Sequence, residues 1–217
     1  DGHASYAFYD ENTAGRMIAP AQLPALPATV RALFFGGISL PAEPCGSTYE
    51  ALMTREAATR VTMLDPNIRP GFIRDEAACR ARLARMIARA DIVKLSDEDL
   101  RWLEGPGEIA ALAGGLLARG PKLVFVTAGS TGAHGFSAGL SLFEPAQRVT
   151  VADTVGAGDT FNAGVLAALD RAGQLTKTAL ATAGAGLISD CLKLGTAAAA
   201  ITVSRAGANP PWAEELP

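Results

Sequence analysis

Short apolar runs alternate with longer amphipathic stretches from about residue 30 onward. Four runs rich in valine, leucine, isoleucine and phenylalanine predict buried strands at residues 30–35, 61–64, 91–95 and 123–127. The stretches between them repeat apolar residues at helical spacing and predict helices at 44–59, 75–90, 97–103 and 107–119. Asp75 and Ser96 stand where two of these helices begin, and both are residue types that cap helix N-termini.

This alternation predicts an α/β fold. Strands that are apolar throughout, rather than at every second position, are typical of a parallel sheet with helices on both faces. Two shorter strands follow at 133–137 and 141–143, joined through residues 138–140 as a hairpin. The rest of the chain is predicted to be helical at 160–172, at 176–192 and from 197 onward.

The first residues have a pattern of their own. Residues 5–9 (Ser-Tyr-Ala-Phe-Tyr) carry aromatic side chains that favour a strand, and neither an initiator methionine nor a signal-peptide pattern precedes them. We therefore expect that an N-terminal part of the native protein is absent from these 217 residues. The proline-rich stretch 20–27 would connect the opening strand to the main sheet.

Composition narrows the classes of function. Lys and Arg number 19 against 22 Asp and Glu, and a net charge of −3 provides no field to hold a nucleic-acid backbone or an anionic membrane. No unbroken apolar run reaches the roughly 18 residues of a membrane span. The three cysteines are odd in number and widely spaced, which favours reduced packing thiols in a cytoplasmic protein over a disulfide framework.

The segment most indicative of chemistry is 153–164, Asp-Thr-Val-Gly-Ala-Gly-Asp-Thr-Phe-Asn-Ala-Gly. Small residues at 156–158 allow a tight turn and a close approach of ligand to backbone, and a helix begins near Asp159. The exposed N–H groups of a helix N-terminus bind anions, and two carboxylates, Asp153 and Asp159, flank this one. Such a loop suits phosphoryl transfer, in which a base takes a hydroxyl proton and donors stabilise the phosphate. By residue type alone, Asp159 also fits a simple N-cap.

Other common motifs are missing. The segment lacks the Gly-Lys-Ser/Thr ending of a phosphate-binding loop, and Phe161 breaks a dinucleotide fingerprint. Residues 105–110 match Gly-x-Gly-x-x-Ala but follow a helical stretch, so the strand that a dinucleotide site requires is absent. His3 and His134 have no partners at metal-ligand spacing, which argues against a histidine metal site.

The twelve residues 153–164 resemble the C-terminal signature of the ribokinase-like (PfkB) carbohydrate kinases, and the remaining segments agree with that family in order and spacing. The fructokinase and 2-keto-3-deoxygluconate kinase branch is the most similar. The resemblance implies a three-layer ribokinase-like fold with a mostly parallel sheet. Residues 1–18 would form part of a β lid, and residues 19–217 the nucleotide-binding and catalytic domain.

The resemblance also implies roles for the residues of the signature. Asp159 would be the general base, and the backbone N–H groups of Gly156, Ala157 and Gly158 would form the anion hole with it. Asp153 and the carbonyl of Val155 resemble a monovalent-cation site.

Further nucleotide-binding residues are implied on other segments. They are Thr127, Gly129 and Gly132 after the strand at 123–127, Lys94 and Ser96 near the end of the strand at 91–95, and Thr196 in the alanine-rich C-terminal helix. Asp99 occupies the place of a glutamate that organises magnesium in the family's Asn-x-x-Glu, here Ser-x-x-Asp. Without the resemblance, residues 127–132 fit an ordinary turn after a strand, residues 96–99 a capped surface helix, and the alanine-rich segment a packed helix.

Substrate contacts are implied for Tyr9 in the lid and for Asn67 and Arg69 in an Asp-x-Asn-x-Arg turn at 65–69. Arg69 could contact a phosphoryl or sugar oxygen, whereas Asn67 also fits an Asx turn.

The sequence thus predicts ATP-dependent phosphorylation of a sugar hydroxyl in the cytoplasm, with Mg²⁺, with K⁺ as a candidate second cation, and with no nucleic-acid or membrane partner. The resemblance allows a homodimer formed through the lid strand. Alternatives are a non-catalytic nucleotide- or phosphate-binding fragment of the same fold, a 2-keto-3-deoxygluconate kinase and a nucleoside kinase. Most sugar-binding groups of the family lie in an N-terminal segment without counterpart here, so we expect the 217 residues alone to be a poor kinase.

Overall fold

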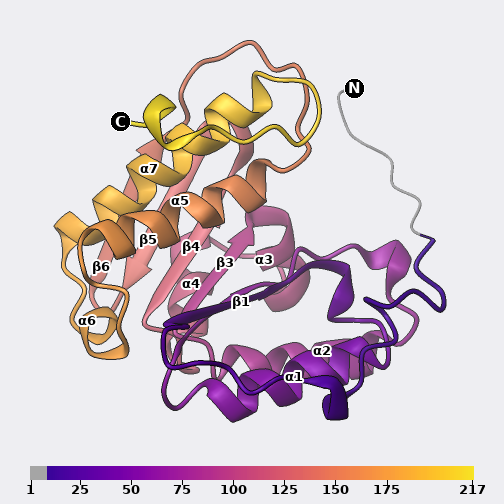
Figure 1. Cartoon of the computed structure of the whole chain (residues 1–217). Coiled ribbons are helices and arrows are strands. Elements are labelled where there is room, and N and C mark those ends of the chain that lie inside the picture. Colours follow the sequence, from indigo (N-terminus) through magenta and orange to yellow (C-terminus); the bar gives the residue numbers. More distant parts are fainter. Residues whose placement is uncertain (1–8) are drawn as a thin grey trace.

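A six-stranded sheet lies between two layers of helices in the computed structural model, which describes residues 9–217 (Figure 1). The first four strands are parallel and adjacent in chain order: β1 (Ala32–Gly36), β2 (Val61–Asp65), β3 (Ile92–Ser96) and β4 (Leu123–Thr127). The hairpin of β5 (Gly132–Ser137) and β6 (Leu140–Pro145) extends the sheet in antiparallel fashion. The predicted α/β fold and mostly parallel sheet are confirmed.

Helices cover both faces of this sheet, as predicted. One layer contains α1 (Cys45–Glu56), α2 (Glu76–Ile87), α3 (Asp97–Glu104) and α4 (Ile109–Leu117). The other contains α5 (Ala157–Arg171), α6 (Lys177–Ala181) and α7 (Ala185–Val203) (Figure 1). Short 3-10 turns lie at η1 (Pro20–Gln22), η2 (Gly37–Ser39), η3 (Pro70–Phe72), η4 (Gly129–Thr131) and η5 (Ala213–Glu215).

Alternate residues of each strand enter different cores, because successive side chains of a strand point to opposite faces. In β2, Val61 and Met63 pack against α5 and α7, whereas Leu64 packs in the core with α1 to α4. Asp65 follows Met63 by two residues and so faces α5. In β3, Lys94 follows Ile92 in the same way, which places an acidic and a basic residue side by side beneath α5.

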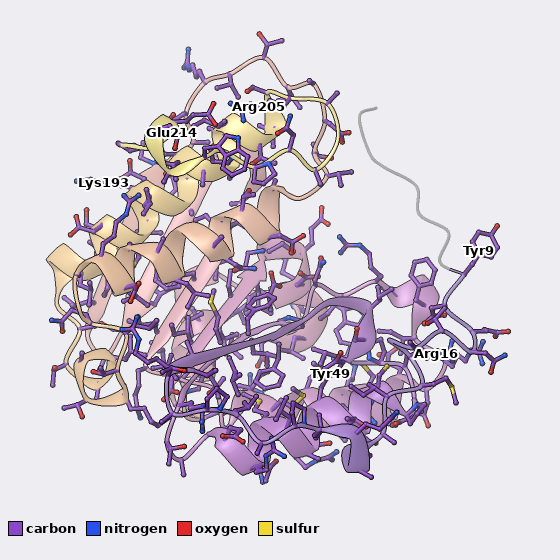
Figure 2. All side chains as sticks on the ribbon, in the orientation of Figure 1. Tyr9, Arg16, Tyr49, Lys193, Arg205 and Glu214 are labelled. Carbon is purple, nitrogen blue, oxygen red and sulfur yellow. The ribbon has the colours of Figure 1, made fainter. Side chains whose placement is uncertain are left out.

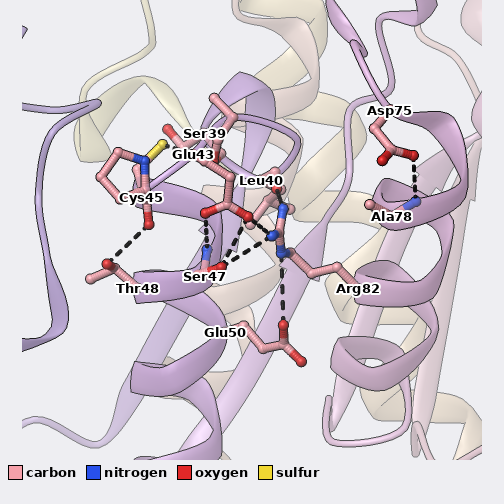
Figure 3. Close-up of polar contacts among 12 residues, drawn as sticks. Ser39, Leu40, Glu43, Cys45, Ser47, Thr48, Glu50, Asp75, Ala78 and Arg82 are labelled. Atoms are coloured by element: carbon pink, nitrogen blue, oxygen red, sulfur yellow. Dashed lines mark hydrogen bonds and ion pairs between the residues drawn. The ribbon is translucent and has the colours of Figure 1, made fainter. Parts of the chain in front are cut away.

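The loop after β1 is fixed by a buried arginine. Arg82 of α2 donates through Nη1 to the carbonyl of Leu40 at 2.6 Å, through Nη2 to Ser47 Oγ at 3.2 Å, and pairs with Glu43 (Figure 3). Glu43 in turn accepts from the hydroxyl of Ser47 in α1 at 2.9 Å. This network joins α1, α2 and the loop that carries Ile38 toward the carboxyl edge of the sheet.

The C-terminal helices differ from the prediction. The expected break between 192 and 197 is wrong, because α7 runs without interruption from 185 to 203, and the chain instead breaks at 182–184 between α6 and α7. Gly184 is the N-cap of α7, while Gly195 lies inside it. A Cβ at Gly195 would lie 2.8 Å from the Phe161 ring of α5, and one at Gly164 would lie 2.7 Å from the Gly195 Cα. Gly195 is therefore required by helix packing and does not end a helix.

Helix α7 also has the length and mean hydropathy, 1.3, of a membrane span, although polar residues interrupt its apolar sequence. However, 56% of its most apolar window is buried inside the molecule against α5 and the sheet. Core packing thus accounts for its composition.

All three cysteines are buried and unpaired, as expected of packing thiols. Burial raises the pKa of the Cys191 thiol in α7 to about 12, so this group stays protonated at neutral pH.

The predicted lid strand at 5–9 lies outside the described residues except for Tyr9. Residues 9–18 form turns and irregular backbone without a strand.

The contact between α5 and α7 yields a stability test. Gly164→Ala should lower the free energy of unfolding by about 1–3 kcal/mol, because the new methyl group meets the backbone of Gly195. Gly186→Ala in α7 is the matched control: its methyl group has open space, and replacing a helical glycine should stabilise the protein by about 0.5–1 kcal/mol. Denaturant unfolding measures both, and equal effects of the two substitutions would contradict this packing.

Candidate active site

Three strands end at one edge of the sheet with polar residues. Asp65, Ser96 and Thr127 are the last residues of β2, β3 and β4. In open α/β sheets, ligands bind in the crevice outside these carboxyl ends. The first turn of α5 returns to the same edge, since residues of that turn and of β2 and β3 line one cavity.

The N-terminus of α5 presents free backbone donors. Gly156 is the N-cap and adopts φ +80°, a left-handed conformation that favours glycine. Within residues 9–217, the N–H groups of Gly156, Gly158 and Asp159 donate to no acceptor, and that of Ala157 makes a long bond of 3.4 Å to the carbonyl of Thr154. Three free donors at the positive end of a helix have the geometry that suits a bound anion.

Asp159 is the third residue of α5, so its interpretation as the N-cap is wrong. The helix begins earlier than expected because glycine at 156 supplies the turn. The Asp159 side chain is exposed and neither accepts a hydrogen bond nor forms an ion pair with any residue that the structure describes. Its carboxylate is thus available to accept a proton from a hydroxyl bound beside it.

Asp153 ties the turn before α5 to the C-terminal loop. One carboxylate oxygen accepts from the N–H of Val155 at 3.0 Å and the other from the N–H of Gly207 at 2.9 Å. These two donors hold the pKa of Asp153 below its ordinary value. Each oxygen keeps a further lone pair, so the ionised carboxylate fits the expected cation site. The same carboxylate links the turn before α5 to the C-terminal loop.

A buried ion pair lies under the first turn of α5. Lys94 Nζ donates to Asp65 Oδ2 at 3.1 Å, and Asn162 Nδ2 of α5 donates to the same oxygen at 2.7 Å. Both charged side chains are at most 5% exposed. A Cβ placed on Gly158 would lie 2.9 Å from Lys94 Nζ, so the ammonium group lies against Gly158 in the first turn of α5.

Two cavities meet at this helix terminus. We call the first, of about 190 Å³, the β2–β3 cavity; its lining comprises Ile38, Asp65, Asn67, Arg69, Lys94, Thr154, Val155, Gly156, Gly158 and Asp159. We call the second, of about 560 Å³, the α5–α7 cavity; its lining includes Thr127, Gly129, Gly132, Arg148, Thr154, Ala157, Gly158, Thr196, Ala199 and Ala200. Thr154 and Gly158 border both, so a ligand that fills both cavities passes the free N–H groups.

The structure therefore brings together most predicted residues. The expected nucleotide residues Thr127, Gly129, Gly132 and Thr196 line the α5–α7 cavity, whereas Lys94 lies in the β2–β3 cavity. Asn67 and Arg69 line the β2–β3 cavity as expected of substrate contacts. Asn67 does not supply an Asx turn: its own N–H donates to Asp65 Oδ1 at 3.1 Å, so the turn belongs to Asp65.

Three predicted residues lie away from both cavities. Ser96 caps α3 and accepts from the N–H of Asp99 at 2.9 Å, which fits the alternative of a capped helix. The buried Asp99 accepts from the N–H groups of Ile68 at 3.0 Å and Ser96 at 3.4 Å. Burial raises the pKa of Asp99 above its ordinary value. Tyr9 points outward at the molecular edge and is 93% exposed (Figure 2).

These contacts bear on the expected metals. Asp99 is buried and lines neither cavity, so it does not fit a direct ligand of a magnesium ion bound with the nucleotide. Within residues 9–217, no three side chains of His, Cys, Asp or Glu gather at metal-binding distance.

Sequence reasoning assigned no role to Asp65 and Asn162. Both belong to motifs that were singled out, at 65–69 and 153–164, but Asn162 stands 97 residues from its partner. Two signals in the sequence were available. Asp65 is a polar residue at the end of an apolar strand, and Asn162 carries an amide about one helical turn after Asp159.

Comparison with known proteins supports the resemblance. Residues 9–215 match the model of the pfkB family carbohydrate kinases. A fructokinase from Rhizobium leguminosarum bv. trifolii is 56% identical over 182 residues, which cover 84% of this chain and 56% of the relative.

Solved structures share the fold. The chain superposes on the ATP-bound fructokinase from Xylella fastidiosa with a TM-score of 0.80 at 24% identity, covering 96% of this chain and 66% of that one. It also matches the aminoimidazole riboside kinase from Salmonella enterica, complexed with aminoimidazole riboside and an ATP analogue, with a TM-score of 0.75 at 26% identity, covering 89% of this chain and 62% of that one. The chain thus spans less than two thirds of the length of these proteins.

The two hydrogen bonds accepted by Asp153 can be tested by their dependence on pH. Because its pKa is lowered in the folded state, the stabilisation it provides is present above the ordinary value of 3.8 and is lost as the pH falls through the lower folded value. The amide proton shifts of Val155 and Gly207 should titrate together in NMR spectra, with one midpoint below 3.8. Asp153→Asn should abolish this titration. Separate midpoints, or a common one above 3.8, would contradict the shared carboxylate.

Proposed function

The chain belongs to the pfkB family of carbohydrate kinases, and from this premise we propose that it carries the phosphoryl-transfer part of a fructokinase-like sugar kinase. The observation that supports the proposal most is the meeting of two cavities at Thr154 and Gly158, beside the Asp159 carboxylate. ATP in the α5–α7 cavity would direct its terminal phosphate toward the β2–β3 cavity, where the sugar hydroxyl would bind.

Each part of this edge then has a chemical task. Asp159 accepts the proton of the attacking hydroxyl, because its carboxylate borders the cavity and no described residue forms a hydrogen bond or ion pair with it. The free N–H groups of Gly156, Gly158 and Asp159 stabilise the negative charge that develops on the transferred phosphoryl group. The Lys94 ammonium group adds a positive charge beside Gly158. Holding the reacting groups in position is the main contribution that a protein makes to phosphoryl transfer.

The nucleotide would occupy a largely apolar cavity. Ala199, Ala200 and Val203 of α7 provide walls for a flat base, together with Val149 and Val151 of the loop between β6 and α5. Thr127 and Gly129 lie at the end toward the sheet edge, where hydroxyl and backbone donors would meet phosphates. The related Salmonella kinase binds an ATP analogue, which supports the same ligand class here.

Cations would assist the phosphoryl transfer, although the described residues contain no cluster of three metal-binding side chains. A magnesium ion would enter with the ATP phosphates and neutralise part of their charge. A potassium ion at Asp153 and the Val155 carbonyl would support the turn that shapes the anion hole. The Asp153 carboxylate, whose pKa is lowered, carries the charge that such a cation needs.

The sugar side is defined less fully by these residues. Asn67 and Arg69, in the turn between β2 and η3, line the β2–β3 cavity, while Tyr9 lies outside it. A second candidate function, nucleotide or phosphate binding without catalysis, follows from this partial acceptor site. Fructose is proposed as acceptor from the 56% identical relative.

The role of Asp159 can be tested directly. Asp159→Asn should lower kcat for fructose-dependent ADP release by about 10²–10⁴-fold, because the amide cannot accept the proton. The Kd for ATP should stay within about twofold, because only the proton acceptor changes. Asp170→Asn in the last turn of α5, an exposed residue paired with Arg31, is the control and should leave kcat unchanged.

Steady-state kinetics of the native protein that carries these residues, with calorimetry for ATP, make the measurements. Unchanged turnover in the Asp159 variant would refute the proposed base. ATP binding that fructose does not alter, without any product, would favour the non-catalytic function.

Nucleotide binding can be tested separately in the α5–α7 cavity. Ala199→Leu should raise the Kd for ADP at least about tenfold, because the larger side chain fills space that the base needs. Ala185→Leu, in the first turn of the same helix and outside the lining, should not change it. Isothermal titration gives both constants; if the two variants bound ADP equally well, the cavity would not be the nucleotide site.

A further inference from the structure

Asp65 stands at the centre of a buried polar network. Its Oδ2 accepts from Lys94 at 3.1 Å and from Asn162 at 2.7 Å, while its Oδ1 accepts from the N–H of Asn67 at 3.1 Å. Asp65 and Asn162 are each 2% exposed and Lys94 is 4% exposed. One carboxylate thereby joins β2, β3 and α5 at the edge where the two cavities meet.

The ammonium group of Lys94 is only partly used by this network. Among the described residues, Asp65 is its one hydrogen-bond acceptor, although an ammonium group has three donors. Its nitrogen lies against Gly158 and borders the β2–β3 cavity, next to the free N–H groups of α5. A buried charge with unused donors is costly in free energy unless a further anion completes its surroundings.

Lys94 and Asp159 border the same cavity with opposite charges, yet they form no ion pair. The charged groups around this cavity are Asp65, Lys94, Arg69 and Asp159. If Lys94 paired with Asp159, the cation would stabilise the ionised carboxylate and make it a weaker base. In the structure, Lys94 instead donates to Asp65 Oδ2, on the strand next to its own.

We propose that Asp65 is a positioning residue for phosphoryl transfer, which directs Lys94 toward the transferred phosphate and keeps it away from the general base Asp159. The proposal rests on the proposed function of this site. Asn162 contributes by orienting α5: its amide donates to Asp65, and its buried Oδ1 has no partner among residues 9–217.

A merely structural role would predict different effects. If Asp65 served only to join β2, β3 and α5, its loss would lower stability without changing the pH dependence of the reaction. Asp91 provides the matched control, because it is also buried and also bonded to a lysine, Lys177, at 2.6 Å. It precedes β3 and so lies at the opposite end of that strand, away from both cavities.

Kinetics of Asp65→Asn, Lys94→Met and the double variant test the proposal. Asp65→Asn should lower kcat at least about tenfold and move the acidic limb of the kcat/KM profile to lower pH, because the released Lys94 pairs with Asp159. In the Lys94→Met background, Asp65→Asn should cause little further loss, and the shift of the limb should disappear. Asp91→Asn should lower the Tm without moving the limb.

Additive losses in the double variant, or an unshifted limb in Asp65→Asn, would overturn the positioning role. A direct readout uses the four lysines of the chain, at 94, 122, 177 and 193. In protein labelled with ¹⁵N-lysine, ADP and, separately, inorganic phosphate should shift the ammonium signal that is missing from Lys94→Met. Asp65→Asn should weaken this response.

These measurements separate the two proposals. If the wild-type protein transferred no phosphate to any sugar while the Lys94 signal still responded to ADP in an Asp65-dependent way, the proposed function would fail, but Asp65 would still position Lys94 toward a bound phosphate. If turnover were normal and the Lys94 signal ignored ADP and phosphate, the positioning would fail and the function would stand.

Discussion

The close contact between α5 and α7 determines where the anion site can be. Gly164 and Gly195 let the two helix backbones meet without intervening side chains, and Phe161 packs edge-on against Phe125 of β4 with ring centroids 6.2 Å apart. Since α5 is held at this depth against the sheet, its first turn ends level with the carboxyl ends of β2 and β3. The first turn of α5 then lines one cavity together with Lys94 and Asp65, and the second cavity borders the same turn.

Local signals in the sequence predicted the parts of this arrangement but not their contacts. The strand at Leu123–Thr127, the caps at Asp75 and Ser96, and the glycine turn before α5 each depend on neighbouring residues, and all were predicted correctly. The bond from Asn162 to Asp65 depends on the packing of α5 on the sheet, which no local pattern contains. The break expected between 192 and 197 is wrong for a related reason: Gly195 lies inside α7, and its contact with Phe161 of α5 depends on tertiary packing.

Two aspartate–lysine pairs with a buried aspartate show what distinguishes a structural pair from one at a site. Lys177 donates to both oxygens of Asp91, at 2.7 and 2.6 Å, and lies 3.4 Å from the carbonyl of Arg60, so its donors have acceptors. Lys94 is more deeply buried and has one acceptor. Removing a charge from water costs free energy that a saturated pair can recover and an unsaturated pair cannot. The unsaturated pair is therefore the one expected at a ligand site.

Glycine at position 158 follows from the same requirement. Gly158 does not adopt a left-handed conformation, so its backbone could accommodate alanine, which favours helices more. What excludes a side chain is the ammonium group of Lys94, 2.9 Å from where a Cβ would lie. The lysine can approach the helix terminus this closely only because residue 158 has no side chain. The N–H of Gly158 is free because it lies in the first turn of α5. The small residues of this turn thus allow the Lys94 ammonium group to approach α5 from the sheet, and they leave the backbone donors accessible to an anion in the cavity.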